Sequence, residues 1–138
     1  MKVFLDTSAF AKRYVVEKGS SAVMALCEQA DVLVVSAICL PEFISALTRL
    51  LREKKLVQKE YEILKVGALS DLADVDICQI TQPVLMSALT LLESNPLRAM
   101  DALHVACALN VGTEFFVSAD RRQLKAAGKA GLNAMDVS

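Results

Sequence analysis

Four acidic residues stand in or beside apolar segments, where a charged side chain is costly to place: Asp6, Glu42, Asp101 and Asp120. Asp101 lies in the stretch RAMDALHVACAL (residues 98–109), which has the composition of a buried helix. Carboxylates are rarely buried unless they are paired or bind a metal. If folding gathers the four, a divalent cation would relieve their mutual repulsion. Oxygen ligands without a histidine or cysteine cluster suit Mg²⁺ or Mn²⁺, and these ions bind phosphates.

Taken one at a time, these acids also have structural explanations. Asp6 and Asp120 could cap the helices that follow them, Asp120 could pair with a following arginine, and Glu42 could be an ordinary first-turn acid. The only histidine, His104, lies three residues after Asp101 and therefore on nearly the same helical face. We expect it to be packed and hydrogen-bonded, arranging the acids or the first helix rather than acting as a ligand or base. The four acids together indicate a metal site more specifically than any one of them does alone.

Alternating strands and helices form the framework that would gather these acids. Strands are predicted near residues 2–5, 32–35, 75–81 and 113–118, with a short edge strand near 133–137. Helices are predicted over 7–30 with a break at Gly19 and Ser20, over 41–52, 56–72 and 83–93, from about Pro96 to Gly112, and over 121–131. This order predicts an α/β, doubly wound domain with a central parallel sheet and right-handed crossovers. Ligands of such sheets bind beyond the carboxyl ends of the strands, where we expect the acids to converge.

Composition limits the class of protein. A chain of 138 residues fits one domain, residues 1–138. No apolar run approaches the roughly 20 residues of a membrane helix and no signal-peptide core follows Lys2, so we expect a cytoplasmic protein. The four cysteines lack a C-x-x-C pair and are expected to be reduced, packed thiols. The net charge of −1 gives no general attraction for polyanions, so nucleic-acid binding would need a local patch. Basic clusters occur at 12–13, 49–55, 121–122 and 125–129, and most are explained as solvated helix faces.

Four segments, taken in order, resemble a known family. VFLDTSAFAKRYVVEKGS, SAICLPEF, RAMDALHVACAL and FFVSADRRQLKAA look like the acidic motifs of the PIN-domain ribonucleases, particularly the VapC-type toxins of bacterial and archaeal toxin–antitoxin pairs. The resemblance spans almost the whole chain. It implies a single PIN-like domain of three layers, α/β/α, with strand order 3-2-1-4-5 and helices on both faces of the sheet.

The resemblance also implies an activity and a site. It implies a Mg²⁺- or Mn²⁺-dependent endoribonuclease that hydrolyses phosphodiester bonds of single-stranded or structured RNA. One or two ions would be held by Asp6, Asp101 and Asp120, with Glu42 bound directly or through water. Ser8 and Ser118 would supply hydroxyl groups that order ligands or water.

Basic residues beside the acidic motifs are candidates for phosphate contacts: Lys12, Arg13 and Arg98. The expected partners are an RNA substrate, a second copy of the chain in a homodimer, and a cognate antitoxin protein that inserts an arginine or lysine toward the acids. The leucine-rich hairpin of residues 42–72 is predicted either to offer a dimer or antitoxin surface or to pack entirely within the domain.

Two other enzyme classes are excluded by single positions. A haloacid dehalogenase-type phosphatase needs a second aspartate two residues after the first, where Ser8 stands, and a response-regulator receiver needs an aspartate after the third strand, where Thr81 and Gln82 stand. The remaining alternative is a non-catalytic PIN-fold module that binds RNA or protein.

Overall fold

Strand β1 (Lys2–Leu5) lies at the centre of a five-stranded parallel sheet in this computed structural model, which describes residues 1–138. The strand order is β3-β2-β1-β4-β5, and all neighbours are parallel, which confirms the predicted topology. The other strands are β2 (Val32–Ser36), β3 (Asp76–Cys78), β4 (Phe115–Ser118) and β5 (Asn133–Asp136). The chain proceeds from β1 toward one edge and returns to fill the other side, so the order reverses between β1 and β4. Ligands of open α/β sheets bind at such a point.

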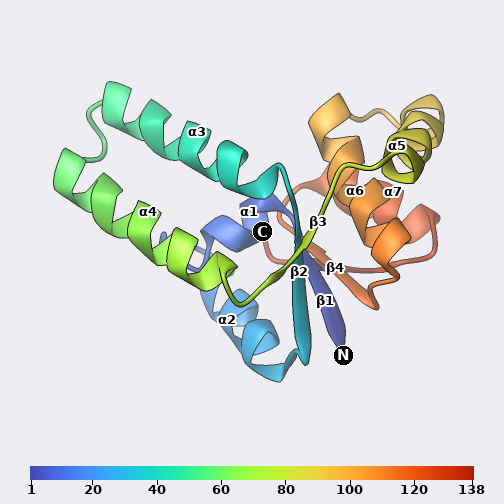
Figure 1. Cartoon of the computed structure of the whole chain (residues 1–138), viewed down its shortest axis with the longest axis horizontal. Helices are drawn as coiled ribbons and strands as arrows, with labels where there is room; N and C mark the ends of the chain where they lie inside the picture. Colours follow the sequence, from blue (N-terminus) through green and yellow to red (C-terminus); the bar gives the residue numbers. More distant parts are fainter.

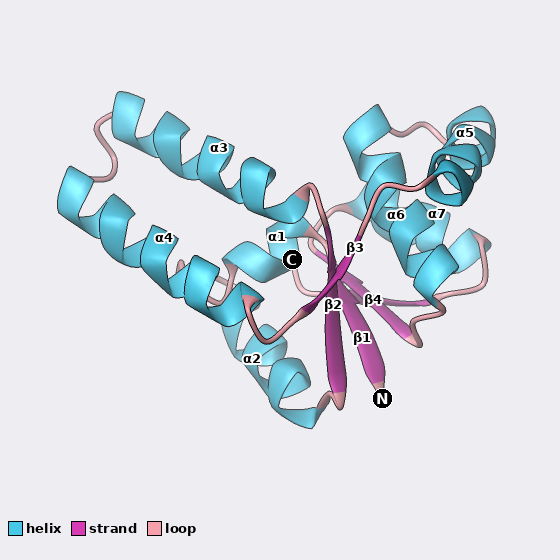
Figure 2. Ribbon diagram, viewed as in Figure 1, coloured by secondary structure: helices cyan, strands magenta, loops and turns pink.

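Seven helices cover the two faces of the sheet, as Figures 1 and 2 show. They are α1 (Thr7–Ala11), α2 (Ser20–Gln29), α3 (Cys39–Arg52), α4 (Gln58–Leu72), α5 (Gln82–Ser94), α6 (Ala99–Val111) and α7 (Arg121–Lys129). Helices α1 to α4 pack against one face and α5 to α7 against the other. The domain therefore has the three layers that the sequence predicted.

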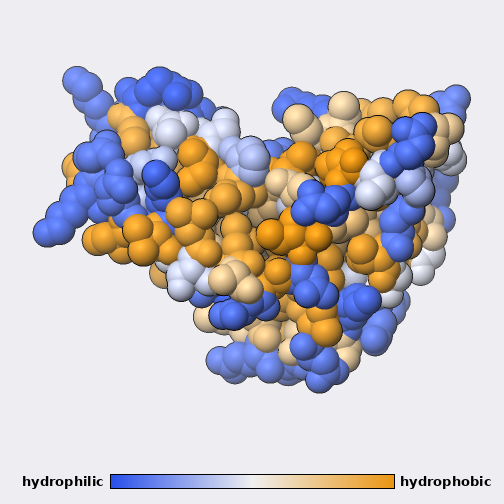
Figure 3. Space-filling view, viewed as in Figure 1, coloured by the Kyte–Doolittle hydropathy of each residue, from blue (hydrophilic) through white to orange (hydrophobic).

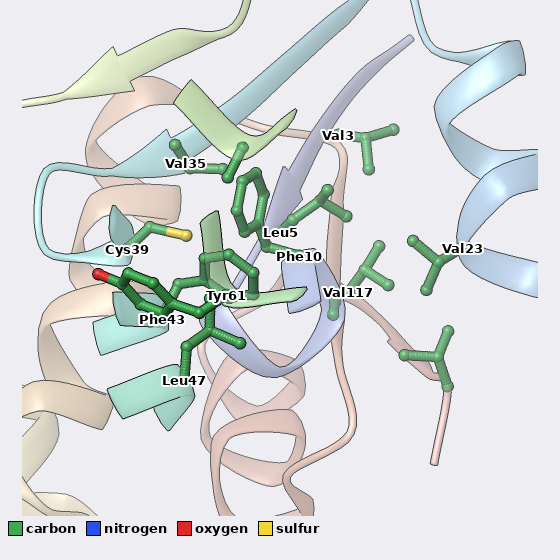
Figure 4. Close-up of a cluster of buried hydrophobic side chains, with 13 residues drawn as sticks. Val3, Leu5, Phe10, Val23, Val35, Cys39, Phe43, Leu47, Tyr61 and Val117 are labelled. Atoms are coloured by element: carbon green, nitrogen blue, oxygen red, sulfur yellow. The ribbon is translucent and has the colours of Figure 1, made fainter. Parts of the chain in front are cut away.

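The alternation of side chains along β1 divides the core between the two faces. Val3 and Leu5 belong to the cluster under α1 to α4, whereas Phe4 belongs to the cluster under α5 to α7. In the first cluster Phe10 and Phe43 meet edge to face with ring centroids 5.5 Å apart, and Figure 4 shows them with Leu5. Burial of such rings is the main force that fixes α1 and α3 on the sheet.

Several predicted boundaries shift because side chains end elements early. Helix α6 begins at Ala99 with Arg98 as its N-cap, rather than near Pro96. Asn95 is extended, as the residue before a proline prefers, and its side-chain amide donates to the carbonyl of Leu91, which closes α5. The strand predicted over 75–81 ends at Cys78, because Thr81 caps α5.

The break between the first two helices is wider than predicted. Helix α1 ends at Ala11 and α2 starts at Ser20. Gly19 has a φ of 91°, and a Cβ there would lie 1.8 Å from the carbonyl oxygen of Val137. Only glycine fits this close approach of the chain to its own C-terminal segment.

Helices α3 and α4 form a hairpin that extends beyond the sheet (Figures 1 and 2). Phe43 and Leu47 of α3 are buried, but Ile63 and Val66 of α4 are each 63% exposed. The alternative that the whole hairpin packs internally is therefore wrong. Figure 3 shows apolar surface on the hairpin beside its polar tip. No helix of the chain is both long enough and apolar enough to span a membrane.

Candidate active site

All four acids lie where the chain leaves the sheet or begins a helix. Asp6 follows β1 and is the N-cap of α1, and Asp120 follows β4 and is the N-cap of α7. Glu42 and Asp101 lie in the first turns of α3 and α6. At each position the orphan N–H groups of the helix stabilise negative charge. Each acid lies at the place in its strand or helix that the sequence predicted, and the capping considered as an alternative for Asp6 and Asp120 also occurs.

Asp6 is almost completely buried and accepts hydrogen bonds on both carboxylate oxygens. The backbone N–H of Ala9 donates to Oδ1 at 2.9 Å, and the hydroxyl of Ser8 donates to Oδ1 at 2.7 Å, with Oδ2 at 2.9 Å. The hydroxyl of Ser118 donates to Oδ2 at 2.7 Å. Burial nevertheless raises the pKa of Asp6, because removal from water outweighs the hydrogen bonds that favour the charged form.

The two predicted serines join Asp6 to the loop after β4. The backbone N–H of Ala119 donates to Oγ of Ser8 at 3.0 Å, and that of Asp120 donates to Oγ of Ser118 at 2.9 Å. Each hydroxyl thus accepts from this loop and donates to Asp6. The arrangement fixes the position of Asp120 relative to Asp6 without any contact between the two carboxylates.

His104 and Thr7 hold Glu42. The imidazole Nε2 of His104 and the hydroxyl of Thr7 each lie 2.5 Å from Oε1 of Glu42, and Oγ1 of Thr7 is 3.2 Å from Nε2. Burial acts to raise the pKa of Glu42, but the hydrogen bonds from His104 and Thr7 outweigh it and the pKa falls below its usual value. His104 is packed and hydrogen-bonded to an acid, as predicted. Sequence reasoning missed Thr7, although its place directly after Asp6 was a usable signal.

Gln123 bridges the remaining two acids. Its side-chain Nε2 donates to Oδ1 of Asp101 at 3.0 Å and lies 3.5 Å from Oδ2 of Asp120. Burial raises the pKa of Asp101, and the charges of Asp120 and Glu42 raise it further. Sequence reasoning missed Gln123. Its place three residues after the capping Asp120 was the only signal, because a Gln there commonly faces back toward the cap.

These contacts form one connected polar group at the carboxyl edge of the sheet. Asp6 reaches Asp120 through Ser118, Asp120 reaches Asp101 through Gln123, and the helix of Asp101 carries the histidine that binds Glu42. None of the four acids forms a salt bridge with lysine or arginine. No three histidine, cysteine, aspartate or glutamate side chains are arranged to hold a metal ion as they stand.

Lys12 does not occupy the place predicted for it. Its side chain is 8% exposed, and its ammonium donates to the carbonyl of Lys18 at 2.6 Å and to Glu17 at 3.2 Å. The chain turns back after α1, so this ammonium closes the turn and is not available to a phosphate. The expectation for Lys12 is therefore corrected.

The two predicted arginines differ in their surroundings. Arg13 is 16% exposed, with Nη2 3.6 Å from Asp71 and its guanidinium beside the ring of Tyr14, so it joins the turn after α1 to α4. Arg98 is exposed at the start of α6, and its charge acts to lower the pKa of Asp101 against the stronger effects that raise it. Of the three predicted basic residues, only Arg98 lies open beside an acid.

Comparison with known proteins agrees with this fold. Residues 3–129 match the family model described as the PIN domain, so the chain belongs to the PIN-domain family. Two curated relatives from Mycobacterium tuberculosis, Ribonuclease VapC45 (strain CDC 1551 / Oshkosh) and Ribonuclease VapC49 (strain ATCC 25618 / H37Rv), are each 34% identical to this chain over 142 residues. Each match covers 94% of this chain and 91% of the relative.

Solved structures share the fold at lower identity. The M. tuberculosis toxin VapC20, described as cleaving the sarcin–ricin loop, superposes with a TM-score of 0.69 at 18% identity, covering 94% of this chain and 95% of that one. A toxin–antitoxin complex from Klebsiella pneumoniae gives a TM-score of 0.71 at 14% identity, covering 99% and 98%. The resemblance to PIN domains of the VapC type is confirmed.

Proposed function

We propose that this chain is a Mg²⁺- or Mn²⁺-dependent endoribonuclease and the toxin of a toxin–antitoxin pair. The observation that carries the proposal is the acidic group itself. Burial raises the pKa values of Asp6 and Asp101, and no lysine or arginine forms a salt bridge with any of the four acids. The 34% identity to proteins named Ribonuclease VapC supports the same activity.

The ligand atoms at this edge suit a hard divalent cation. They are carboxylate and hydroxyl oxygens, which Mg²⁺ and Mn²⁺ prefer. The carboxylates are held by neutral donors, such as the hydroxyls of Ser8 and Ser118 and the amide of Gln123, which can give way to a cation. Asp6, Asp101 and Asp120 would hold one or two ions, and Glu42 would bind directly or through water. When bound, the ions would neutralise charge on the phosphate and lower the pKa of a water molecule.

The chain's own residues would orient the carboxylates and the substrate. Gln123 keeps Asp101 and Asp120 together, and His104 with Thr7 fixes the rotamer of Glu42. Arg98, exposed at the start of α6, would contact a substrate phosphate. Single-stranded or looped RNA fits best, because its flexible backbone can bend to reach an edge formed by four helix starts.

We propose that the α3–α4 hairpin meets the protein partners. A groove of about 390 Å³ lies between this hairpin and the segment after α1, lined by apolar side chains that include Leu56, Ile63 and Leu64. An exposed apolar groove of this kind suits a second copy of the chain or an antitoxin segment. One structure similar to this chain is described as a toxin–antitoxin complex, which supports an antitoxin partner.

The proposal is tested by incubating purified protein with mixed cellular RNA in Mn²⁺ or in EDTA. Asp6→Asn and Asp101→Asn should each reduce cleavage by at least about 100-fold. Asp74→Asn, an exposed acid remote from the site, is the matched control and should cleave as wild type does. Cleavage that persists in EDTA or in both site variants would contradict the mechanism. RNA or protein binding without any cleavage would favour the non-catalytic module.

A further inference from the structure

Four basic side chains line one side of a surface hollow near the acids. Arg121, Arg122, Lys125 and Lys129 of α7 line one side, and Ser94 with Asn95, where α5 ends, line the other. We call this the α7 hollow; its volume is about 360 Å³. All four basic residues are exposed. The hollow therefore presents a row of cations to solvent along one helix.

No carboxylate pairs with these cations across the hollow. No carboxylate lines the α7 hollow, and none of its four basic residues forms a salt bridge. The only side-chain hydrogen bond of the row is internal: the ammonium of Lys129 donates to the carbonyl of Ser94 at 3.1 Å, across the hollow. Since the whole chain has a net charge of −1, this concentration of positive charge is local, and it attracts anions.

The α7 hollow lies directly beside the acidic group. Helix α7 turns Gln123, which binds Asp101, toward the acids and presents its cations on the other side. Asp120, the N-cap of the same helix, immediately precedes Arg121. The opposite wall continues through residues 95–98 into α6, which carries Asp101. Figure 1 shows α5, α6 and α7 on the same side of the sheet. One ligand could therefore extend from the hollow to the acids.

The row of cations suits a chain of phosphates better than a single one. Arg121 and Lys129 are separated by about 12 Å along the helix, at 1.5 Å per residue. That length accommodates about three or four phosphates at the ~3.4 Å rise of a stacked strand. A second hollow of about 210 Å³ shares Lys129 and is lined partly by apolar atoms of Leu91 and Ala126. Such a surface suits a ribose or a base next to the phosphates.

We propose that the α7 hollow binds the phosphates of single-stranded RNA on one side of the bond that is cleaved. The inference rests on the proposed nuclease function for the identity of the polyanion, and it adds a binding site away from the acids. It assigns to Arg121, Arg122, Lys125 and Lys129 the substrate contacts that Lys12 and Arg13 do not offer.

Binding is measured by fluorescence anisotropy with a labelled single-stranded RNA in EDTA, so that no cleavage occurs. The variant Lys125→Gln/Lys129→Gln changes the residues of the row that lie farthest from the acids. Its control is Lys54→Gln/Lys59→Gln at the tip of the α3–α4 hairpin, which removes the same charge. We expect the hollow variant to bind about tenfold more weakly or worse, with a salt slope reduced by about 1.4, because each lost phosphate contact removes about 0.7.

Each outcome of this experiment decides the inference. Equal affinity of the hollow variant and wild type, equal losses in both variants, or no RNA binding by wild type would overturn it. Retained RNA affinity together with lost binding to polyglutamate would assign the hollow to an acidic protein and would also overturn it. Thermal unfolding of both variants should match wild type, because exposed substitutions change stability by at most about 0.5 kcal/mol.

Cleavage is measured separately, with Mn²⁺, so that the two proposals fail in different ways. If wild type cuts no RNA but only the hollow variant loses RNA binding, the binding site stands and the nuclease does not. If wild type cuts RNA and the hollow variant binds it normally, the nuclease stands and the site does not.

Discussion

The imidazole of His104 lies with Nε2 2.5 Å from Oε1 of Glu42 and thereby joins helix α6 to helix α3. His104 is 1% exposed, its Nδ1 has no hydrogen-bond partner, and its ring packs against Phe4 in a T-shaped arrangement. The hydroxyl of Thr7 donates to the same glutamate oxygen. His104 is therefore a positioning residue, which holds one acid of the site from the helix that carries another.

Replacing His104 with alanine should destabilise the protein by about 3 kcal/mol, because it leaves a cavity and removes a partner of a half-buried carboxylate. Thr7→Val removes one hydrogen bond and keeps the volume, so its cost should be about 1 kcal/mol. Urea denaturation measures both. The double variant should cost less than the sum of the single ones, since all three side chains share one contact. Strict additivity would show that the contact is absent in solution.

Asp6→Asn should stabilise the metal-free protein at neutral pH by an amount on the order of 1 kcal/mol. Burial raises the pKa of Asp6, so the folded state binds this proton more tightly than the unfolded state, whose value is near 3.8. Above the pKa of Asp6 in the folded protein, the native state carries the cost of a buried charge. As pH falls through that pKa, Asp6 takes up a proton and the native state becomes more stable. Asparagine keeps an acceptor for the N–H of Ala9 and removes the charge.

The measurement is thermal unfolding in EDTA as a function of pH. The difference between Asp6→Asn and wild type should shrink as the solution becomes acidic, because protonated aspartic acid and asparagine are then similar in charge. Asp74→Asn, on the surface, should show no such difference at any pH. A variant less stable than wild type at neutral pH would show that the hydrogen bonds to Asp6 outweigh its burial.

Three of the four cysteines should resist thiol reagents in the folded protein. Cys39, Cys78 and Cys107 are buried, and burial raises the pKa values of Cys39 and Cys107 to about 12. Because only the thiolate reacts, a disulfide reagent at about pH 8 should modify only the partly exposed Cys27, and slowly. All four should react after unfolding. Rapid reaction of more than one thiol in the native protein would contradict this packing.

The strands and the positions of the acids along the chain were predictable, because both depend on local sequence. The apolar runs that form β1, β2 and β4 are followed within a few residues by Asp6, Glu42 and Asp120. Parallel strands bring such ends to one edge whatever the details of the helices. The order of the strands came from the family resemblance rather than from periodicity.

Contacts between distant helices were not predictable from spacing. Gln123 meets Asp101 only because α7 packs beside α6, and Lys12 turns away from Asp6 because the chain reverses after α1. The basic residues of α7 were visible in the sequence as charge clusters. Their opposite wall lies at Ser94 and Asn95, remote along the chain, so the hollow itself was not visible.

Mn²⁺ or Mg²⁺ should stabilise wild type against thermal unfolding, because ions that bind only the folded acidic group shift the unfolding equilibrium. At about 100 times the dissociation constant the gain is about 2.7 kcal/mol. Asp6→Asn and Asp101→Asn should lose most of this gain, whereas Asp74→Asn should keep it. A choline salt of equal ionic strength separates specific binding from screening. An equal effect of Mn²⁺ on wild type and both site variants would mean that these carboxylates do not hold the ion, and the proposed active site would then need a different cation or none.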